Sequence, residues 1–223
     1  MPALMQKLAL GTGVLALLAV LLPPLAGSAQ HLFAAHMMQH LLIITVAAPL
    51  LVLSGAFAAV ERSSWGQSLA HPVPAWLAFV GVFLFWHWPV AFRWAAENES
   101  TRLLENGSIL VTAILFWSVA LSPRRPDDLS YGARALFVMT AAVATDLPGV
   151  IMVFAPRAFC AMPREDAALW NLTPLQDQQI AGMLMWVPAN LVFFGIATWL
   201  FGRWIADAAQ HDRSSPSTHL VIS

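Results

Sequence analysis

Apolar stretches about as long as a lipid bilayer is thick recur along the whole chain. A bilayer core about 30 Å thick is crossed by about 20 apolar residues in an α-helix. Six such stretches, each ended by proline, glycine or charged residues, are Leu8–Leu25, His31–Ser54, Val73–Phe92, Leu103–Leu121, Ala135–Ala155 and Ile180–Ile205. Because lipid cannot hydrogen-bond to exposed backbone, this pattern predicts an all-α fold. We expect residues 1–223 to form a single transmembrane domain, a polytopic transmembrane helical bundle of about six spans.

The first apolar stretch has two interpretations. Ala26-Gly-Ser-Ala29 follows it and resembles the small-residue site at which signal peptidase cleaves. Residues 1–29 are therefore either a first span or a signal peptide. The stretch Leu8–Leu25 exceeds the roughly 7–15 residues usual for the apolar region of a signal peptide. We favour a retained span, and cleavage would leave five spans.

The positive charges favour a cytoplasmic N-terminus. An even number of spans places both termini on one side, and a cytoplasmic N-terminus then puts seven Lys or Arg inside against four outside. By the positive-inside rule this predicts cytoplasmic termini, with residues 206–223 as a polar cytoplasmic tail. Only 10% of residues are charged and the net charge is −1, so we exclude nucleic acid as a partner and expect membrane lipid.

A histidine pair marks the outer half of the second span. His36 and His40 are four residues apart, so they project from one face of a helix together with Gln39. Imidazole and thioether are copper ligands, and the neighbouring Met37 adds a thioether. Ionisable residues inside a span usually serve function. The pattern predicts a metal site, with copper as the first candidate, while hydrogen bonding between helices is the alternative.

Several other polar side chains are expected at the same depth. His87 in Trp86-His-Trp-Pro89 is either a third ligand or a partner of a backbone carbonyl. Met183 on the last span is a candidate thioether ligand. Asp146 lies inside the fifth span, where we expect its carboxylate to hold a histidine ring or Arg157.

The loops near the outer surface hold weaker candidates. His31, at the outer end of the second span, is either a ligand or a solvated end residue. Cys160 and Met162 lie between the last two spans and are candidates for a point of ion access. Thr173-Pro174-Leu-Gln176 predicts a capped helix start, whose first turn presents Asp177 and Gln178.

Three blocks of sequence resemble the CtaG-like family of membrane cytochrome c oxidase assembly factors. These blocks are His36–Leu53, Trp86–Pro89 and Pro174–Pro188. The resemblance implies a multi-span protein of the bacterial cytoplasmic (inner) membrane that matures haem-copper cytochrome c oxidase, by handling or delivering copper to its catalytic subunits. Carried over by position, it implies functional roles for His36, His40, His87, Asp177, Gln178 and Gly182.

The chain departs from this family at one place. Where many members read His-x-x-Glu-His, it has Arg102-Leu-Leu-Glu-Asn106, so that only Glu105 matches. The resemblance then implies a supporting role for Glu105 in a reduced or altered site.

Two further classes of function stay open. The first is a b-type membrane cytochrome, with a haem held by two histidines from different helices. The second is a transporter for a metal or small solute, although we find no internal repeat. The sequence shows no nucleophile-base pair, Gly-rich phosphate loop or His-Glu-x-x-His motif, so we expect a protein that is not an enzyme. The oligomeric state is open, a homo-oligomer included, and so is the choice between copper donor and subunit chaperone.

Overall fold

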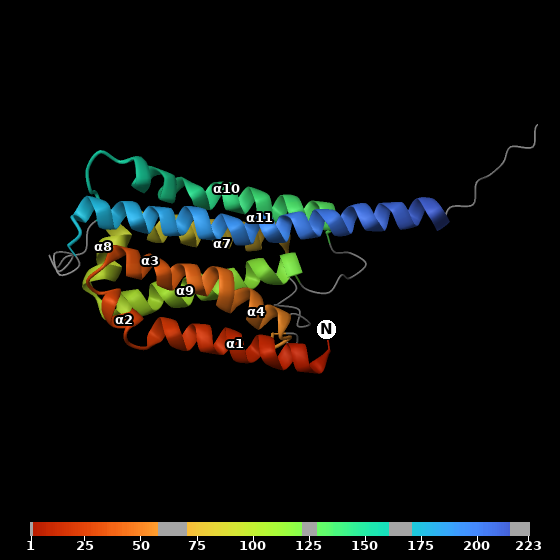
Figure 1. Ribbon diagram of the computed structural model, residues 1–223, viewed down its shortest axis with the longest axis horizontal. Helices are drawn as coiled ribbons and strands as arrows, with labels where there is room; N and C mark the ends of the chain where they lie inside the picture. The colour runs from red at the N-terminus through yellow and green to blue at the C-terminus, as the bar shows by residue number, and fades with distance from the viewer. Residues whose placement is uncertain (1, 58–70, 122–128, 161–170, 215–223) are drawn as a thin grey trace, which may run out of the picture.

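The computed structural model describes residues 2–57, 71–121, 129–160 and 171–214, and in these ranges every regular element is a helix (Figure 1). In chain order these elements are α1 Ala3–Leu21, α2 Leu25–Ser28, α3 Phe33–Leu42, the π-helix η1 Ile43–Ala47, α4 Ala48–Leu53, α7 Pro72–Trp86, α8 Pro89–Glu97, α9 Glu99–Leu121, α10 Tyr131–Phe154 and α11 Pro174–Ser214. Five spans are long and apolar enough to cross a membrane, or six if the bent pair α7–α8 counts as one. The predicted all-α membrane bundle is confirmed.

The third span, predicted over Val73–Phe92, consists of two helices separated by a break. Helix α7 ends at Trp86, α8 begins at Pro89, and the two are bent by 72°. Proline lacks the N–H that would continue the helix and disfavours helical geometry in the residue before it. Trp88 is accordingly extended, with ψ 133°. The break leaves His87 at the corner between the two helices.

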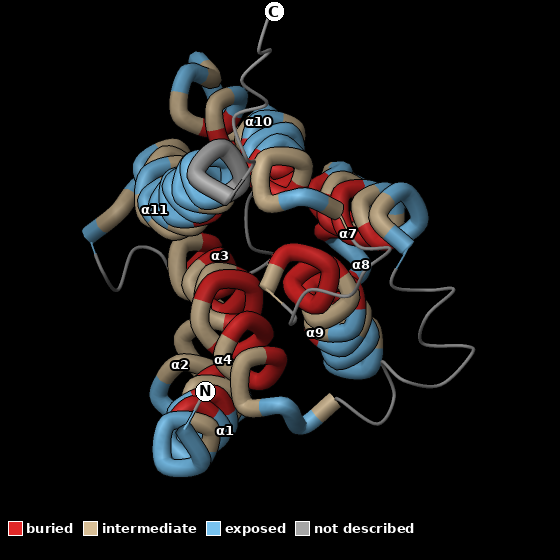
Figure 2. The backbone as a smooth tube through the Cα atoms, turned by 90° about the vertical axis from the view of Figure 1, so that its right-hand side faces the viewer, coloured by how far each residue is buried: buried red, intermediate tan, exposed pale blue. Residues whose placement is uncertain are grey.

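The ends of α1 and α11 nearest the chain termini lie at the opposite end of the bundle from the short helices α2 and α8. The start of α1 and the end of α11 lie at one end, and α2, α8 and the start of α3 lie at the other (Figure 1). The placement of both termini on the cytoplasmic side stays a prediction. The buried residues of α3, α4, α7 and α9 are turned toward the middle of the bundle, while α1 and α11 expose much of their outer surfaces (Figure 2).

Aromatic rings fill the middle of the bundle. Phe79, Phe116 and Phe193 come from three helices, with ring centroids 4.6 Å apart for the first two and 5.8 Å for the last two. Trp117 packs 5.1 Å from Phe193 and donates from Nε1 to the carbonyl of Ile44, at 2.7 Å. This hydrogen bond satisfies a carbonyl of the π-helix η1.

Helices α10 and α11 form a close antiparallel pair. Gly149 and Gly182 face each other, and a Cβ added at Gly182 would lie 2.7 Å from the carbonyl oxygen of Gly149. Small residues are what allow the backbones of membrane helices to approach this closely. Gly182, singled out by the resemblance, therefore has a packing role.

Helix α1 is packed on the second span. A Cβ added at Gly13 would lie 3.2 Å from Cγ of Leu51, and Gln39 donates from Nε2 to the carbonyl of Val20 at 2.7 Å. Gln39 thus supports the orientation of α3 against α1 rather than the imidazole rings directly. Retention of the first span stays a prediction.

Candidate metal site

His36, His40 and Glu105 form a buried cluster. Nε2 of His36 lies 3.3 Å from Oε1 and 3.2 Å from Oε2 of Glu105, and Nε2 of His40 lies 3.4 Å from Oε1. One ligand atom from each residue lies within 4.8 Å of those from the other two. All three side chains are almost completely inaccessible to solvent. This spacing is compatible with a shared metal ion.

The helices place these side chains by simple geometry. His36 and His40 lie one turn apart on α3, and their ring centroids are 4.7 Å apart. Glu105 reaches them from the second turn of α9, whose start is capped because Asn98 Oδ1 accepts from the backbone N–H of Ser100, at 2.9 Å. The ring of Phe92 packs edge-on against His36, with centroids 5.8 Å apart. The cluster is thus enclosed by α3, α8 and α9.

Asp177 fixes the start of the helix that carries both histidines. Its carboxylate accepts hydrogen bonds from the backbone N–H groups of Phe33, at 2.8 Å, and Ala34, at 2.9 Å. A carboxylate at a helix N-terminus satisfies N–H groups that have no partner within the helix. Asp177 therefore ties α3 to α11 three residues before His36.

His87 presents a nitrogen lone pair beside the cluster. Its Nδ1 lies 2.6 Å from the carbonyl oxygen of Phe83, and because a carbonyl only accepts, Nδ1 carries the proton. In the neutral ring Nε2 then holds a lone pair, and this buried atom has no hydrogen-bond partner among the described residues. The ring centroids of His87 and His40 are 5.7 Å apart. His87 thus has the tautomer of a metal ligand bound through Nε2.

Unsatisfied polar atoms gather around the cluster. Within the described ranges the buried side-chain atoms without a hydrogen-bond partner include Nδ1 of His36, both ring nitrogens of His40, Nε2 of His87 and Oε2 of Glu105. Buried polar atoms are normally paired, and leaving them unpaired is costly. A cation accepting lone pairs from several of these atoms accounts for their convergence. Imidazole nitrogen with one carboxylate suits copper or zinc better than magnesium or calcium.

The expectation that Met183 is a ligand is wrong. Its side chain is 53% exposed on the outer surface of α11, whereas Met185, two residues later and on the opposite face, is 8% exposed. Met185 lines a cavity together with His40. In the sequence Met183 shares one helical stripe with the polar residues Gln179 and Asn190, which favours it over Met185 as a candidate. The buried stripe Gln178, Ala181 and Met185 is the one that faces the bundle.

The expectation for Asp146 is also wrong. Its two carboxylate oxygens accept from Nδ2 of Asn190, at 2.8 and 2.9 Å, instead of holding a histidine ring or Arg157. The side chain is partly buried between α10 and α11. The position of a residue along a span can be predicted from the sequence. The face of α10 that packs against α11 cannot.

Gln178 organises the turn after α10. Its Oε1 accepts from the backbone N–H of Phe159 at 2.9 Å and of Cys160 at 3.0 Å, and its Nε2 donates to the carbonyl of Met152 at 3.3 Å. Gln178 is fully buried and holds this turn against α11. Its role is to support the fold near the site, and all its bonds go to backbone.

The remaining candidates do not belong to the group of His36, His40 and Glu105, or lie outside the described residues. Burial raises the pKa of the Cys160 thiol to about 11, against the opposing effect of Arg93. A protonated thiol is a weak metal ligand. Met37 is buried in the apolar core, and His31 is partly buried just before α3. Met162 lies outside the described residues.

Comparison with known proteins gives one family. A family model described as cytochrome c oxidase caa3 assembly factor (Caa3_CtaG) matches residues 2–207. No curated protein and no solved structure matches the chain significantly. The matched range includes every helix that carries the cluster.

Proposed function

Because the chain belongs to the cytochrome c oxidase caa3 assembly factor family, we propose that its cluster of His36, His40 and Glu105 holds copper destined for the oxidase. Family membership gives the coarse function, assembly of a cytochrome c oxidase by a multi-pass membrane protein. The observation that supports copper handling is the convergence of three buried ligand atoms within 4.8 Å of one another. The proposed role is non-enzymatic.

The donor set suits an ion that must be released again. His36 and His40 would bind through Nε2, Glu105 through its carboxylate, and His87 offers a fourth donor from the corner between α7 and α8. Sites with three protein ligands and one exchangeable position are open, whereas four fixed ligands close a site. In this proposal His36, His40 and Glu105 are the three ligands, and His87 stands at the exchangeable position. The negative carboxylate offsets the charge of the cation in a low-dielectric surrounding. Copper is the cargo of this site and leaves it unchanged.

The depth of the cluster suits delivery at the outer side of the bacterial cytoplasmic membrane. His36 and His40 lie about 4 and 10 Å along the axis from Phe33, where α3 starts. With cytoplasmic termini, that end of the bundle is the outer one. The catalytic copper of haem-copper oxidases is expected in the outer half of their membrane domain. The partners proposed here are therefore the catalytic subunits of the oxidase.

The structure favours copper over the two alternative functions. The cavity next to His40 offers about 30 Å³ to water-sized molecules, far too little for a haem. Phe116 packs against Phe79 and Phe193, two rings of the cavity wall, with ring centroids 4.6 and 5.8 Å apart. This packing favours exchange from the outer side over transport across the membrane.

The test combines metal analysis with assembly of the oxidase. The gene would be deleted, and the copper content, haem spectra and activity of the oxidase measured in isolated membranes after rescue with the wild type or with His36→Ala and His40→Ala. We expect loss of oxidase copper in the deletion and no rescue by either variant. His71→Ala, an exposed histidine at the start of α7, is the matched control and should rescue fully.

Two outcomes would overturn the proposal. Normal oxidase copper and activity in the deletion strain would remove the function. Full rescue by both alanine variants, or purified wild-type protein that binds no copper, would remove the site.

A further inference from the structure

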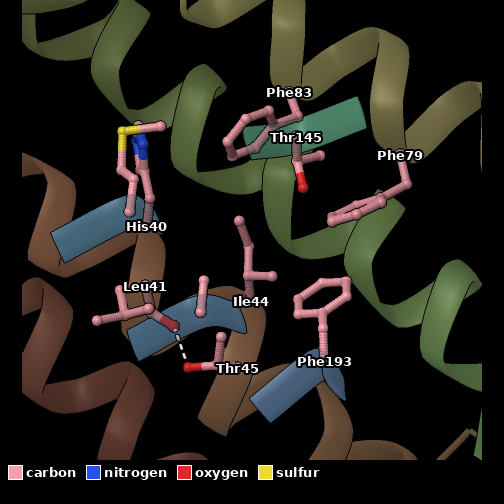
Figure 3. Close-up of a pocket in the computed structure, with 10 residues that line it drawn as sticks. His40, Leu41, Ile44, Thr45, Phe79, Phe83, Thr145 and Phe193 are labelled. Carbon is pink, nitrogen blue, oxygen red and sulfur yellow. Dashed lines mark hydrogen bonds between the residues drawn. The ribbon is translucent and has the colours of Figure 1, made fainter. Parts of the chain in front are cut away.

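A cavity lies directly beside the cluster, and His40 belongs to both. Its wall comes from α3, η1, α7, α10 and α11, and the space open to water-sized molecules is about 30 Å³. This is room for about two water molecules or one small ion with an exchanging ligand. Figure 3 shows His40 on one side of this space and the rings of Phe79 and Phe193 on the other.

The polar atoms of the cavity wall present lone pairs. The hydroxyl of Thr45 donates to the carbonyl of Leu41 at 2.6 Å, and that of Thr145 donates to the carbonyl of Ala141 at 2.9 Å. A hydroxyl has one proton, so each oxygen has only lone pairs left for the cavity. Neither ring nitrogen of His40 has a hydrogen-bond partner among the described residues, although Nε2 lies 3.4 Å from Oε1 of Glu105. A wall of this kind attracts a cation and repels an anion.

Met185 adds a soft ligand to the same wall. Its side chain lines the cavity from α11. Methionine in a helical bundle usually fills gaps in the core, yet here open space remains beside it. Among the ligands that proteins offer, thioether sulfur selects the cuprous ion. The cluster beside it offers only harder nitrogen and oxygen atoms from His36, His40 and Glu105.

The backbone is widened at this point of the second span. The π-helix η1 follows His40 by three residues, and its Ile44 and Thr45 line the cavity. Single π-helical turns occur often at functional sites, where they displace the packing of a regular helix. Here the widened turn lies between His40 and the aromatic layer, where the cavity is found.

We propose that this cavity is a second, softer copper station in which Met185 Sδ and His40 bind Cu(I), supported by the lone pairs of Thr45 and Thr145. The inference rests on the proposed copper function of the cluster. His40 is shared, so an ion moves between the two stations by releasing His36 and Glu105 and binding Met185 while the imidazole of His40 stays bound. Copper remains Cu(I) throughout, so the step needs no electron donor or acceptor.

The test compares two methionines that lie two residues apart. Full-length wild type, Met185→Leu and Met183→Leu are purified in detergent and loaded with Cu(I). Leucine keeps the size and apolar character of methionine and removes the sulfur. X-ray absorption at the copper edge should show a sulfur ligand in the wild type and in Met183→Leu, and none in Met185→Leu. Chelator competition should show Cu(I) binding weakened about tenfold by Met185→Leu alone.

A second variant tests the cavity without touching sulfur. Ala189 lines the cavity, and Ala189→Leu should fill it and remove the sulfur ligand signal while the cluster still binds copper. Gly195→Leu is the matched control on the same helix, because nothing lies within 4 Å of a Cβ added there.

The outcomes distinguish failure of the second copper station from failure of the proposed copper function. Copper bound by the wild type with nitrogen and oxygen ligands only, unchanged in Met185→Leu, overturns the second station and leaves the cluster in place. Failure of the wild type to bind copper overturns the proposed function itself.

Discussion

Glu105 on α9 meets Nε2 of His36 on α3 at 3.2 to 3.3 Å, although the two residues are 69 positions apart in the chain. The contact joins the second span to the fourth at full burial. A buried carboxylate is tolerated only when partners compensate its charge. With His40 on the same side, the carboxylate has two imidazoles and the proposed cation for this purpose.

The first prediction concerns the charge of Glu105. Glu105→Gln keeps the shape of the side chain and removes the negative charge. We expect copper affinity to fall by about 10- to 100-fold, because the amide neither offsets the cation nor offers two equivalent oxygens. Affinity is measured by competition with a copper chelator.

The matched control for this variant is Glu99→Gln. Glu99 lies in the first turn of the same helix and is exposed, so its replacement should leave copper binding unchanged. Equal affinities for Glu105→Gln and the wild type would show that the carboxylate does not bind the ion.

The second prediction concerns His87. Because its Nδ1–H is held by the carbonyl of Phe83, its Nε2 is available as a further donor. His87→Ala should weaken copper binding less than His36→Ala, by about tenfold or less. In Cu(II)-loaded protein, electron paramagnetic resonance should detect one nitrogen ligand fewer. An unchanged nitrogen count would mean that His87 only pairs with the carbonyl.

The third prediction concerns Asp177, which caps α3 from another helix. Asp177→Ala leaves the N–H groups of Phe33 and Ala34 without their acceptor, at a cost of about 1–2 kcal/mol in the free energy of unfolding. Thermal unfolding in detergent should show a lower midpoint, and copper binding should weaken because α3 loses its position. Asp177→Asn retains one acceptor oxygen, so its unfolding midpoint should lie between those of the wild type and Asp177→Ala. A midpoint equal to that of the wild type would contradict the capping role.

The spans and the capped start of α11 were predictable from local sequence. Length and apolar character indicated the spans, and Thr173 with Gln176 indicated the start of α11. The structure confirms this cap, since Gln176 N–H donates to Thr173 Oγ1 at 3.2 Å and Thr173 N–H donates to Gln176 Oε1 at 2.9 Å. Each of these features depends on residues within one turn of each other.

The pairing of helix faces was not predictable in the same way. A shift of two residues along α11 separates Met183 from Met185 by more than half a turn, and both faces of that helix are apolar. Asp146 accepts a hydrogen bond from Asn190 because α10 packs on α11 and not on α3. Glu105 could be singled out only through resemblance, because its partners lie on a distant span.

The fourth prediction concerns the thiol of Cys160. Burial raises its pKa to about 11, so at pH 8 the reactive thiolate is a small fraction and increases only as the pH approaches 11. Alkylation by iodoacetamide in detergent should therefore be slow at pH 8 and accelerate through pH 10. Rapid reaction at pH 8, compared with the same protein unfolded in denaturant, would contradict the buried position.

The fifth prediction concerns the approach of α10 to α11. Gly182→Ala adds a Cβ 2.7 Å from the carbonyl oxygen of Gly149 and 2.9 Å from Cβ of Met152, so the two helices must separate. Overpacking of this kind costs about 1–3 kcal/mol. It should also displace Asp177 and Met185, which lie on either side of Gly182 along α11. We expect a lower unfolding midpoint together with weaker Cu(I) binding.

Gly202→Ala, on the same helix with nothing within 4 Å of the added Cβ, should change neither quantity. If both variants behaved like the wild type, the close contact between Gly149 and Gly182 would not be what holds α11 in place beside the copper cluster.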